Sequence, residues 1–552
     1  MHDTASIQHR LVFLTVNSSY SHSSLALPLL HCACRKLANW EWIRHDITND
    51  SNVIEAVRYI YNQHCDLLVT DLYLFNRQTA LDVLQRYHVL KPDCRIAVGG
   101  PECLGNGAEE LLTLYPWLDC VFRGEGEHIF YEYLLHFDDQ TIPSHSILPA
   151  EGNAVYDHWA ESPGPATDPF FVTDKPFVQI ETSRGCPMNC FYCTSGKSPT
   201  RYRSLEQVRQ ELNLLSRRGV KELRLLDRTF NLPCNRGAAL LKMFREEFSS
   251  MRFHLELHPQ FLDEGLKQEL LRAHPGQLHI EAGIQCLDAQ VQQLSGRCSQ
   301  VDAALAGLKF LCDIPAFETH ADLLAGLPGQ RWQHILHDTA ALMSVHTAEI
   351  QLEVLKVLPG TPMRQIASEH ALCFSPTAPW DVMQTATMTM EDIQQARDLS
   401  RLLDMTYNHK SLHPAVWIAS QECPDFVVKL LDFFHHANGD SMAVWDLKKR
   451  FLFMLDFCKH YHLERSQKAL AYQWLLAGFL PSQGPDEYSE KVSAIPPEAR
   501  LLSGFPESRT ARESRFWRFD GNDGICYLVY NRSFSLNRPA AIWLPGEKIA
   551  SN

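Results

Sequence analysis

The chain has 552 residues, a net charge of -14 and 45% hydrophobic residues, the composition of a soluble globular protein with several domains. The negative balance argues against a nucleic-acid partner, because nucleic-acid surfaces carry clustered Lys and Arg. The first residues lack the pattern of a secretory signal, and no apolar run approaches the length of a membrane span. We therefore expect a protein of the cytosol that makes no membrane contact. Most of the 17 cysteines have apolar neighbours, which favours reduced thiols over disulfides.

Residues 1–137 alternate apolar strands with helices. We expect strands at 11–17, 40–47, 66–75, 95–100 and 119–124, and helices at 26–38, at 53–64 and between the last two strands. Continuous apolar strands separated by helices predict an α/β fold, a doubly wound Rossmann-like domain with a parallel sheet. Ligands in such folds lie at the carboxyl ends of the strands, here the loops after Asn17, Thr70 and Gly100.

Three further regions follow. Residues 138–172 are rich in Pro, Gly, Asp and Ser and indicate a linker or a wrapping segment. In residues 173–385, strands are expected at 177–183, 222–227, 252–257, 278–285, 318–326 and 349–358. Their regular spacing predicts a partial (β/α)6 barrel of the TIM type, with its chemistry at the strand carboxyl ends. Residues 386–552 form a mainly helical C-terminal extension with a β-hairpin at 515–531, turning at Asn522-Asp523-Gly524.

The segment RGCPMNCFYCT (184–194) places Cys186, Cys190 and Cys193 on one loop after a strand. Three such thiols can bind zinc or an iron–sulfur cluster, or can be coincidence, which the spacing makes a poor explanation. Structural zinc sites usually combine two short clusters into four ligands, and no second cluster of this kind exists here. A cubane cluster held by three cysteines leaves one iron open to a substrate or cofactor. The absence of a fourth thiol is then the functional feature.

The pattern C-x-x-x-C-x-aromatic-C, with Tyr192 as the aromatic, resembles the signature loop of the radical S-adenosylmethionine (radical SAM) superfamily. The resemblance implies a 4Fe–4S cluster on the three cysteines. It also implies that S-adenosylmethionine binds the open iron and is cleaved reductively to a 5′-deoxyadenosyl radical.

Other strand ends support this resemblance and imply contacts to S-adenosylmethionine. The segment 280–286 looks like the family's fourth-strand segment, with Glu281 and Gln285 near the nucleoside. The segment 322–330 looks like the fifth-strand loop, whose backbone at Gly326 and Pro328 approaches the adenine. Where many members have Gly-Gly-Glu to hold the methionine amino group, this chain has LLDRTFN (225–231), which transfers that contact to Asp227. Each segment alone could be only a turn or a core strand. Their order and spacing behind the cysteine loop favour the family resemblance.

The first domain resembles corrinoid-binding domains, which carry D-x-H-x-x-G, S-x-L and Gly-Gly on successive strand-end loops. The corresponding positions here are Tyr20, His22 and Leu25, then Thr70, Asp71 and Leu72, then Gly99 and Gly100. Tyr and Leu replace the Asp and Gly of the first motif, so His22 is either a cobalt ligand or a hydrogen-bonding loop histidine. Gly99 and Gly100 would let a flat macrocycle or its tail lie against the backbone. A flavodoxin-like domain that uses these glycines only for a turn is the alternative.

The segments GGPE (99–102) and FRGEGE (122–127), upstream of the cysteine loop, resemble cobalamin-dependent radical SAM proteins, among them methyltransferases and the anaerobic magnesium-protoporphyrin ester cyclase. The resemblance implies an anaerobic enzyme that modifies a small-molecule substrate by methyl transfer or rearrangement. It also implies a low-potential electron donor of the flavodoxin or ferredoxin type.

Two alternatives stay open. The first is a methylthiotransferase, whose second cluster would need cysteines of the first domain. Those available are Cys32, Cys34, Cys65, Cys94, Cys103 and Cys120. The second is a haem-binding relative of coproporphyrinogen dehydrogenase, which the segments 283–297 and 322–330 also resemble.

Overall fold

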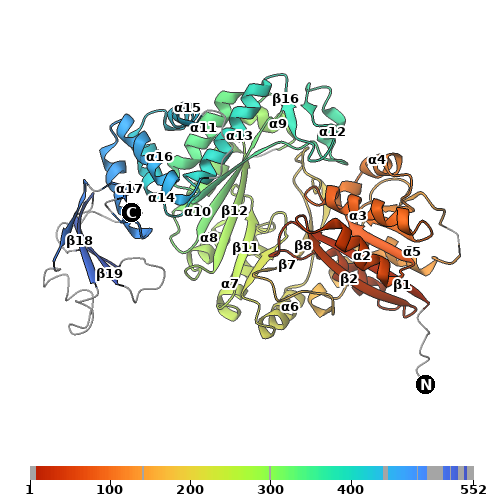
Figure 1. Ribbon diagram of the computed structural model, residues 1–552. Helices are drawn as coiled ribbons and strands as arrows, with labels where there is room; N and C mark the ends of the chain where they lie inside the picture. Colours follow the sequence, from red (N-terminus) through yellow and green to blue (C-terminus); the bar gives the residue numbers. More distant parts are fainter. Residues whose placement is uncertain are drawn as a thin grey trace. The chain divides into compact units, whose positions relative to one another are not determined.

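The computed structural model describes residues 8–139, 142–297, 300–438, 445–480, 483–485, 487–493, 514–522, 524–531 and 540–543. The chain divides into two compact units (Figure 1). The first unit contains residues 1–331 and 354–393, and the second contains residues 332–353 and 394–552. The first unit includes the first predicted α/β domain and most of the second, whose residues 332–353 belong to the second unit.

A six-stranded sheet of order β2-β1-β3-β4-β5-β6 forms the first α/β layer, and all of its pairings are parallel. Its strands are β1 (His9–Asn17), β2 (Trp40–Thr48), β3 (Leu67–Asp71), β4 (Arg95–Gly99), β5 (Cys120–Phe122) and β6 (Ser146–Leu148). The predicted Rossmann-like sheet is thus confirmed. The sixth strand is an addition, because β6 comes from the segment predicted as a linker and pairs with β5 at the sheet edge.

Helices cover both faces of this sheet, as a doubly wound fold requires. They are α1 (Ala26–Cys34), α2 (Val53–Gln63), α3 (Arg77–Leu90), α4 (Gly107–Leu114) and α5 (Gly126–Leu135). One core cluster joins β1 residues such as Val12 and Leu14 to α2, α3 and α4. A second cluster joins Leu11 and Phe13, on the opposite face of β1, to α1 and α5. The alternation of side chains along one apolar strand therefore supplies both cores.

The second sheet of the first unit is also parallel, with the order β13-β12-β11-β10-β7. Its strands are β7 (Val178–Ile180), β10 (Glu222–Leu225), β11 (Arg252–Leu257), β12 (Leu278–Gln285) and β13 (Glu318–Ala325). The connecting helices are α6 (Leu205–Arg217), α7 (Cys234–Glu247), α8 (Glu264–Leu271), α9 (Ala289–Leu294) and α10 (Val301–Cys312). This part also contains α12 (Pro362–Ile366), β15 (Cys373–Phe374) and β16 (Val382–Gln384).

The strand predicted at 177–183 is shorter in the structure, because β7 ends at Ile180. Residues Ser183–Cys186 instead form β8, which pairs antiparallel with β9 (Ser198–Tyr202). The cysteine loop is therefore the connection of a small hairpin rather than the direct continuation of a barrel strand.

The second unit is mainly helical, as predicted. It contains α11 (Trp332–Ser344), α14 (His413–Glu422), α15 (Phe426–Asn438), α16 (Leu447–His460), α17 (Glu464–Leu476) and the sixth predicted strand, β14 (Glu349–Val354). Helix α13 (Met390–Met405) begins in the first unit and continues into the second.

The predicted hairpin is also present, as β18 (Ser514–Gly521) and β19 (Gly524–Asn531) of a four-stranded antiparallel sheet. This sheet also includes β17 (Ser489–Val492) and β20 (Ala540–Trp543). Asp523 of the predicted turn lies outside the described residues. Among the described helices, none combines the length and the apolar character of a bilayer span.

Candidate functional site

The three predicted ligands lie on the loop that joins β8 to β9. Cys186 and Cys190 are buried and Cys193 is half-buried. The loop closes on itself, since the Cys193 amide donates to the Cys190 carbonyl at 3.2 Å and the Lys197 amide to the Met188 carbonyl at 2.8 Å. Burial raises the pKa of the Cys193 thiol, and the neighbouring Cys190 and Cys186 thiols raise it further. The three sulfurs are thus close enough to interact electrostatically.

The connection after α9 supports this loop from outside. The Phe191 amide donates to the Ser295 carbonyl at 2.9 Å. Gly296 has a φ of +70°, and a Cβ there would lie 2.4 Å from the Asn189 carbonyl oxygen, so only glycine allows this approach. The Arg297 guanidinium donates to Cys190 Sγ at 3.7 Å and also to the Gly283 carbonyl of β12. The sequence did not predict this contact of Arg297, because Arg297 lies more than one hundred residues beyond the cysteines.

The chemistry of this loop fits a cluster rather than one metal ion. Among the described residues, no three His, Cys, Asp or Glu side chains are arranged around a single ion. A cubane cluster does not require that arrangement, because each cysteine binds a different iron. The Arg297 guanidinium lies beside Cys190 Sγ, so a positive group faces this predicted ligand. All sixteen described cysteines are free thiols, as the sequence predicted.

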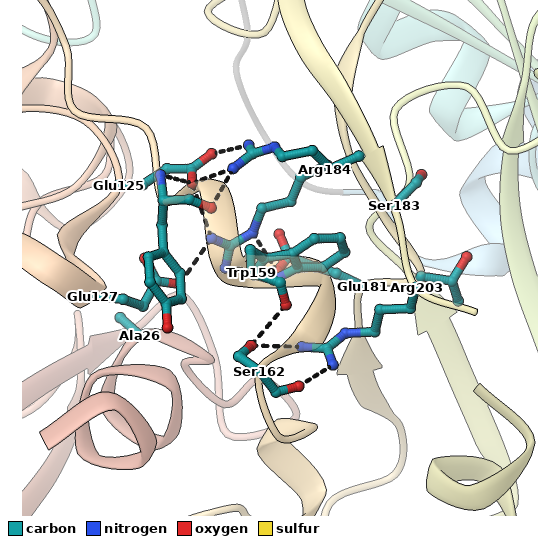
Figure 2. Close-up of polar contacts among 12 residues, drawn as sticks. Ala26, Glu125, Glu127, Trp159, Ser162, Glu181, Ser183, Arg184 and Arg203 are labelled. Atoms are coloured by element: carbon teal, nitrogen blue, oxygen red, sulfur yellow. Dashed lines mark hydrogen bonds and ion pairs between the residues drawn. The ribbon is translucent and has the colours of Figure 1, made fainter. Parts of the chain in front are cut away.

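Arg184, two residues before Cys186, ties the cysteine loop to the first sheet's domain (Figure 2). Its guanidinium lies 2.7 Å from Glu127 Oε1 and 3.4 Å from Glu125 Oε2, and its Nε donates to Glu181 Oε2 at 2.9 Å. Arg201 on β9 adds a second cation that pairs with Glu125. Burial opposes ionisation of Glu125, yet Arg201 and Arg184 hold its pKa below the usual range.

The segment predicted as a linker completes this cluster of charges. Trp159 is fully buried, and the Arg184 and Arg203 guanidinium groups lie 5.0 and 4.7 Å from its ring (Figure 2). Arg203 also donates to the Ser162 carbonyl at 2.7 Å. Residues 156–162 therefore pack against Arg184 and Arg203.

Two of the predicted S-adenosylmethionine contacts have strong protein partners of their own. Asp227 is fully enclosed and accepts hydrogen bonds from the Thr182 amide at 2.7 Å, the Ser183 amide at 3.0 Å and the Thr182 hydroxyl. Its carboxylate thus fixes the backbone that leads into β8. Glu281 on β12 accepts from His254 Nε2 at 2.9 Å. Their roles in S-adenosylmethionine binding stay predictions.

The other predicted contacts lie at the carboxyl ends of β12 and β13. Gln285 has a φ of +68° beside a register shift in the β12–β13 ladder, a backbone conformation that is typical of functional strand ends. Gly326 and Leu327 donate their amides to Gln330 Oε1 at 2.8 and 3.1 Å, which shapes the turn around Pro328. Gln330 itself was not among the predicted residues.

At the first sheet, the structure brings two of the predicted corrinoid loops together. The Leu72 amide donates to the Gly99 carbonyl at 2.7 Å. Gly100 has a φ of +97°, and a Cβ there would lie 2.8 Å from the Leu72 carbonyl oxygen. Thr70 differs, because its hydroxyl donates to the Leu14 carbonyl at 2.7 Å and its side chain is buried within the sheet.

The third loop joins them through Ser24, whose hydroxyl donates to Asp71 Oδ2 at 2.6 Å. His22 is half-buried, with Nδ1 2.9 Å from Ser19 Oγ and its ring against Phe177 at 5.1 Å. Burial and then the Arg224 cation lower the pKa of His22, so its imidazole is neutral, the form that can bind a metal or accept a hydrogen bond.

Large side chains on two of these loops are open to solvent. Tyr20 is 71% exposed and Phe75 is 49% exposed. Exposed aromatic surface at the carboxyl edge of a parallel sheet suits a flat macrocycle, so the residues present fit a corrinoid.

The cysteines required by the methylthiotransferase alternative are dispersed. Cys65 and Cys94 lie 3.8 Å apart under the Tyr87 hydroxyl, within the core cluster on one face of the first sheet. Cys34 and Cys120 belong to the core on the opposite face. Cys65, Cys94 and Cys103 thus lie on one face of the sheet, and Cys34 and Cys120 lie on the other.

Comparison with known families finds a match for the central part of the chain. Residues 180–341 match the model of the radical SAM superfamily, and this range contains the cysteine loop, β10, β11, β12 and β13. This part of the chain is a radical SAM domain. A 4Fe–4S cluster and S-adenosylmethionine follow from this family. Residues 368–485 match a second model, described as a protein of unknown function, DUF4080.

The curated relatives of this radical SAM enzyme are distant. An uncharacterised methyltransferase of Pyrococcus horikoshii is 22% identical over 365 residues, 58% of this chain and 73% of that protein. The 2-(S-pantetheinyl)-carbapenam-3-carboxylate methyltransferase of Streptantibioticus cattleyicolor is 25% identical over 190 residues. That alignment spans 30% of this chain and only 28% of that enzyme.

Solved structures resemble a larger part of the chain. The radical S-adenosylmethionine methyltransferase TsrM of Kitasatospora setae, with cobalamin and a 4Fe–4S cluster bound, matches with a TM-score of 0.52 and 17% identity. The match covers 67% of this chain and 76% of TsrM. The cobalamin-dependent radical enzyme OxsB matches with a TM-score of 0.54 and 13% identity, over 84% of this chain and 78% of OxsB. At these identities the likeness shows the fold.

Proposed function

We propose that this radical SAM enzyme is a cobalamin-dependent methyltransferase that acts on a small molecule. The observation that carries the proposal is the combination of one three-cysteine loop with a six-stranded parallel sheet whose strand-end loops meet at one edge. The names of TsrM, OxsB and the curated methyltransferases support the same reaction class. A low-potential electron donor of the flavodoxin or ferredoxin type and an anaerobic reaction belong to this proposal.

Different residues of the chain would bind the cluster and the corrinoid and orient them. Cys186, Cys190 and Cys193 would hold the cluster, and Arg297 holds the loop that carries them. The loops around His22 and Gly100 would hold the corrinoid, whose chemistry is the transfer of a methyl group from cobalt. Arg184 fixes the cysteine loop to the corrinoid domain through buried ion pairs.

Corrinoid stoichiometry tests this proposal most directly. After anaerobic reconstitution of the cluster in the presence of hydroxocobalamin, we expect about one corrinoid per desalted chain, read from its absorbance. We also expect the bound corrinoid to become methylated when S-adenosylmethionine and a reductant are added. An intact cluster without bound corrinoid would contradict the proposal and leave an ordinary radical SAM enzyme.

Substitution at Gly99 gives a second expected result. A Cβ at Gly99 would lie 3.5 Å from Phe122 Cβ, an ordinary contact, so Gly99→Ala should fold normally and bind the corrinoid. Gly99→Leu places a larger side chain at the strand end, and we expect it to weaken corrinoid binding about tenfold while S-adenosylmethionine binding stays unchanged. Both affinities are measured by titration of the reconstituted protein. Equal loss of both would indicate misfolding instead.

A further inference from the structure

One face of the second sheet packs against the helices through buried aliphatic side chains. Acids and histidines line the opposite face. On β11 the residues concerned are His254 and Glu256, and on β12 they are His279 and Glu281. In the ladder, His254 is opposite His279 and Glu256 is opposite Glu281. The intervening residues, such as Leu255, are fully buried on the other face, as expected for a sheet covered by helices on that side.

Strand β13 extends this row. His320 is opposite Glu281, and Asp322 is opposite Gly283, which has no side chain to occupy the same face. His320 Nε2 lies 3.2 Å from Asp322 Oδ1. Three carboxyl groups, those of Glu256, Glu281 and Asp322, therefore stand on three adjacent strands.

The basic groups on or beside this face are the histidines, Arg224 of β10, which is opposite His254, and Arg228. His254 forms a hydrogen bond with Glu281. Arg228 Nη1 lies 3.8 Å from Glu256 Oε1, which is a long ion pair. Burial raises the pKa of Glu256 to about 7; Arg228 and His254 oppose this rise, and Glu281 and Asp322 add to it. Burial also raises the pKa of Asp322 to about 6, with His320 opposing and Glu281 adding. Burial opposes ionisation of Glu281 too, yet His254 and His320 hold its pKa below the usual range. Glu256 and Asp322, on either side of it, therefore keep their protons close to neutral pH.

His258 is a second, independent sign of a ligand. It follows β11 and continues the alternation of His254 and Glu256. Its side chain is only 5% exposed, yet neither ring nitrogen has a hydrogen-bond partner. Burial, with the Arg297 cation nearby, lowers its pKa to about 3, so the ring is neutral. A buried imidazole without partners is costly, which indicates that a bound molecule supplies them.

We propose that this face is the substrate subsite, that Glu256 and Asp322 bind a basic nitrogen of the substrate, and that His258 bonds a polar group of the same molecule. The inference rests on the proposed function, because it assigns the substrate class of that reaction as small-molecule amines. A cation between Glu256 and Asp322 replaces the protons that these groups hold. Binding of an amine therefore releases protons and becomes tighter as the pH rises through about 6 to 7.

The test uses n-butylamine as the probe and n-butanol as its uncharged counterpart, on the full chain with its cluster reconstituted. Calorimetric titration at pH 6.5 in two buffers of different ionisation enthalpy gives both the affinity and the number of protons released. We expect the amine, but not the alcohol, to bind with proton release. In the Glu256→Gln/Asp322→Asn double variant we expect binding about tenfold weaker and no proton release.

Glu222→Gln is the matched control. Glu222 lies at the start of β10 and is paired with Arg252 at 3.7 Å, and we expect this variant to bind the amine like the unaltered chain. His258→Phe should weaken probes that carry an added hydroxyl, such as 4-aminobutanol, more than n-butylamine. Equal binding of amine and alcohol, absence of amine binding, or amine binding that survives the double variant would each overturn the inference.

Failure of this inference and failure of the proposed function give different results. A chain that holds cluster and corrinoid but does not prefer amines disproves the amine subsite alone. A chain that holds the cluster, binds the amine with proton release and takes up no corrinoid disproves the cobalamin-dependent reaction and leaves the subsite in place.

Discussion

Replacing Cys186, Cys190 and Cys193 with Ala is expected to abolish the iron–sulfur absorbance and all cleavage of S-adenosylmethionine, while the chain stays folded. The physical reason is that the loop is held mainly by backbone contacts, which involve Phe191, Lys197 and the segment at Gly296. The three thiols are the predicted iron ligands, and the cysteines of the first domain lie in the cores on opposite faces of its sheet. Each single variant should also lose most of the cluster, because two thiolates leave two irons without protein ligands.

The measurement is iron and sulfide content after reconstitution, together with the circular dichroism spectrum and the melting temperature. Cys234→Ala is the matched control, because Cys234 is a half-buried thiol at the start of α7 whose Sγ donates weakly to the Phe261 carbonyl. It should keep the full cluster. A triple variant that retains the cluster would disprove the ligand assignment.

The sequence predicted the strands and helices of the α/β parts well because their signals are local. Apolar runs such as 11–17 bury both faces and are recognisable without knowledge of the partner strand. Strand β6 was missed, because three half-buried residues in a segment rich in Pro and Ser carry no periodic signal. Its place at the sheet edge depends on pairing with β5, which is a tertiary effect.

The candidate site also contains residues that local sequence predicts and residues that it does not. The cysteine ligands follow from spacing within one short segment. Arg297, between α9 and α10, and His258, directly after β11, could not be found, because an arginine or a histidine in a connecting segment is usually an ordinary polar residue. Their significance depends on what lies near them in space, which for Arg297 is Cys190 Sγ and for His258 is the lack of any partner. Asp227 shows the converse. This residue was predicted from a motif position, but its Oδ1 accepts from the Thr182 and Ser183 amides and its Oδ2 from the Thr182 hydroxyl.

Arg184→Met is expected to destabilise the first unit and to reduce cluster content, although Arg184 is not a cluster ligand. Removing the guanidinium leaves Glu127 and Glu181 without this partner, and the side chain of Glu127 is only 7% exposed. Breaking a buried ion pair from one side costs about 3 to 5 kcal/mol, because an uncompensated charge remains. Arg184→Lys keeps the charge but cannot reach Glu125, Glu127 and Glu181 together, so we expect an intermediate loss.

The pH dependence and a second substitution separate this ion-pair effect from general loss of packing. Arg184 helps to lower the pKa of Glu125, and the stability from this shift is present above the ordinary pKa of a glutamate and is lost as the pH falls through the lowered pKa. The loss of stability in Arg184→Met should therefore be smaller at pH 4 than at pH 8. Adding Glu127→Gln should restore part of the stability at pH 8, because it removes the buried charge that lost its partner. Urea unfolding measures both effects, and Arg209→Met, which breaks an exposed pair with Glu206 and Glu247, serves as the control. A loss that is equal at both pH values and unaffected by Glu127→Gln would show that Arg184 acts by packing on Trp159 rather than by joining the cysteine loop to the first domain.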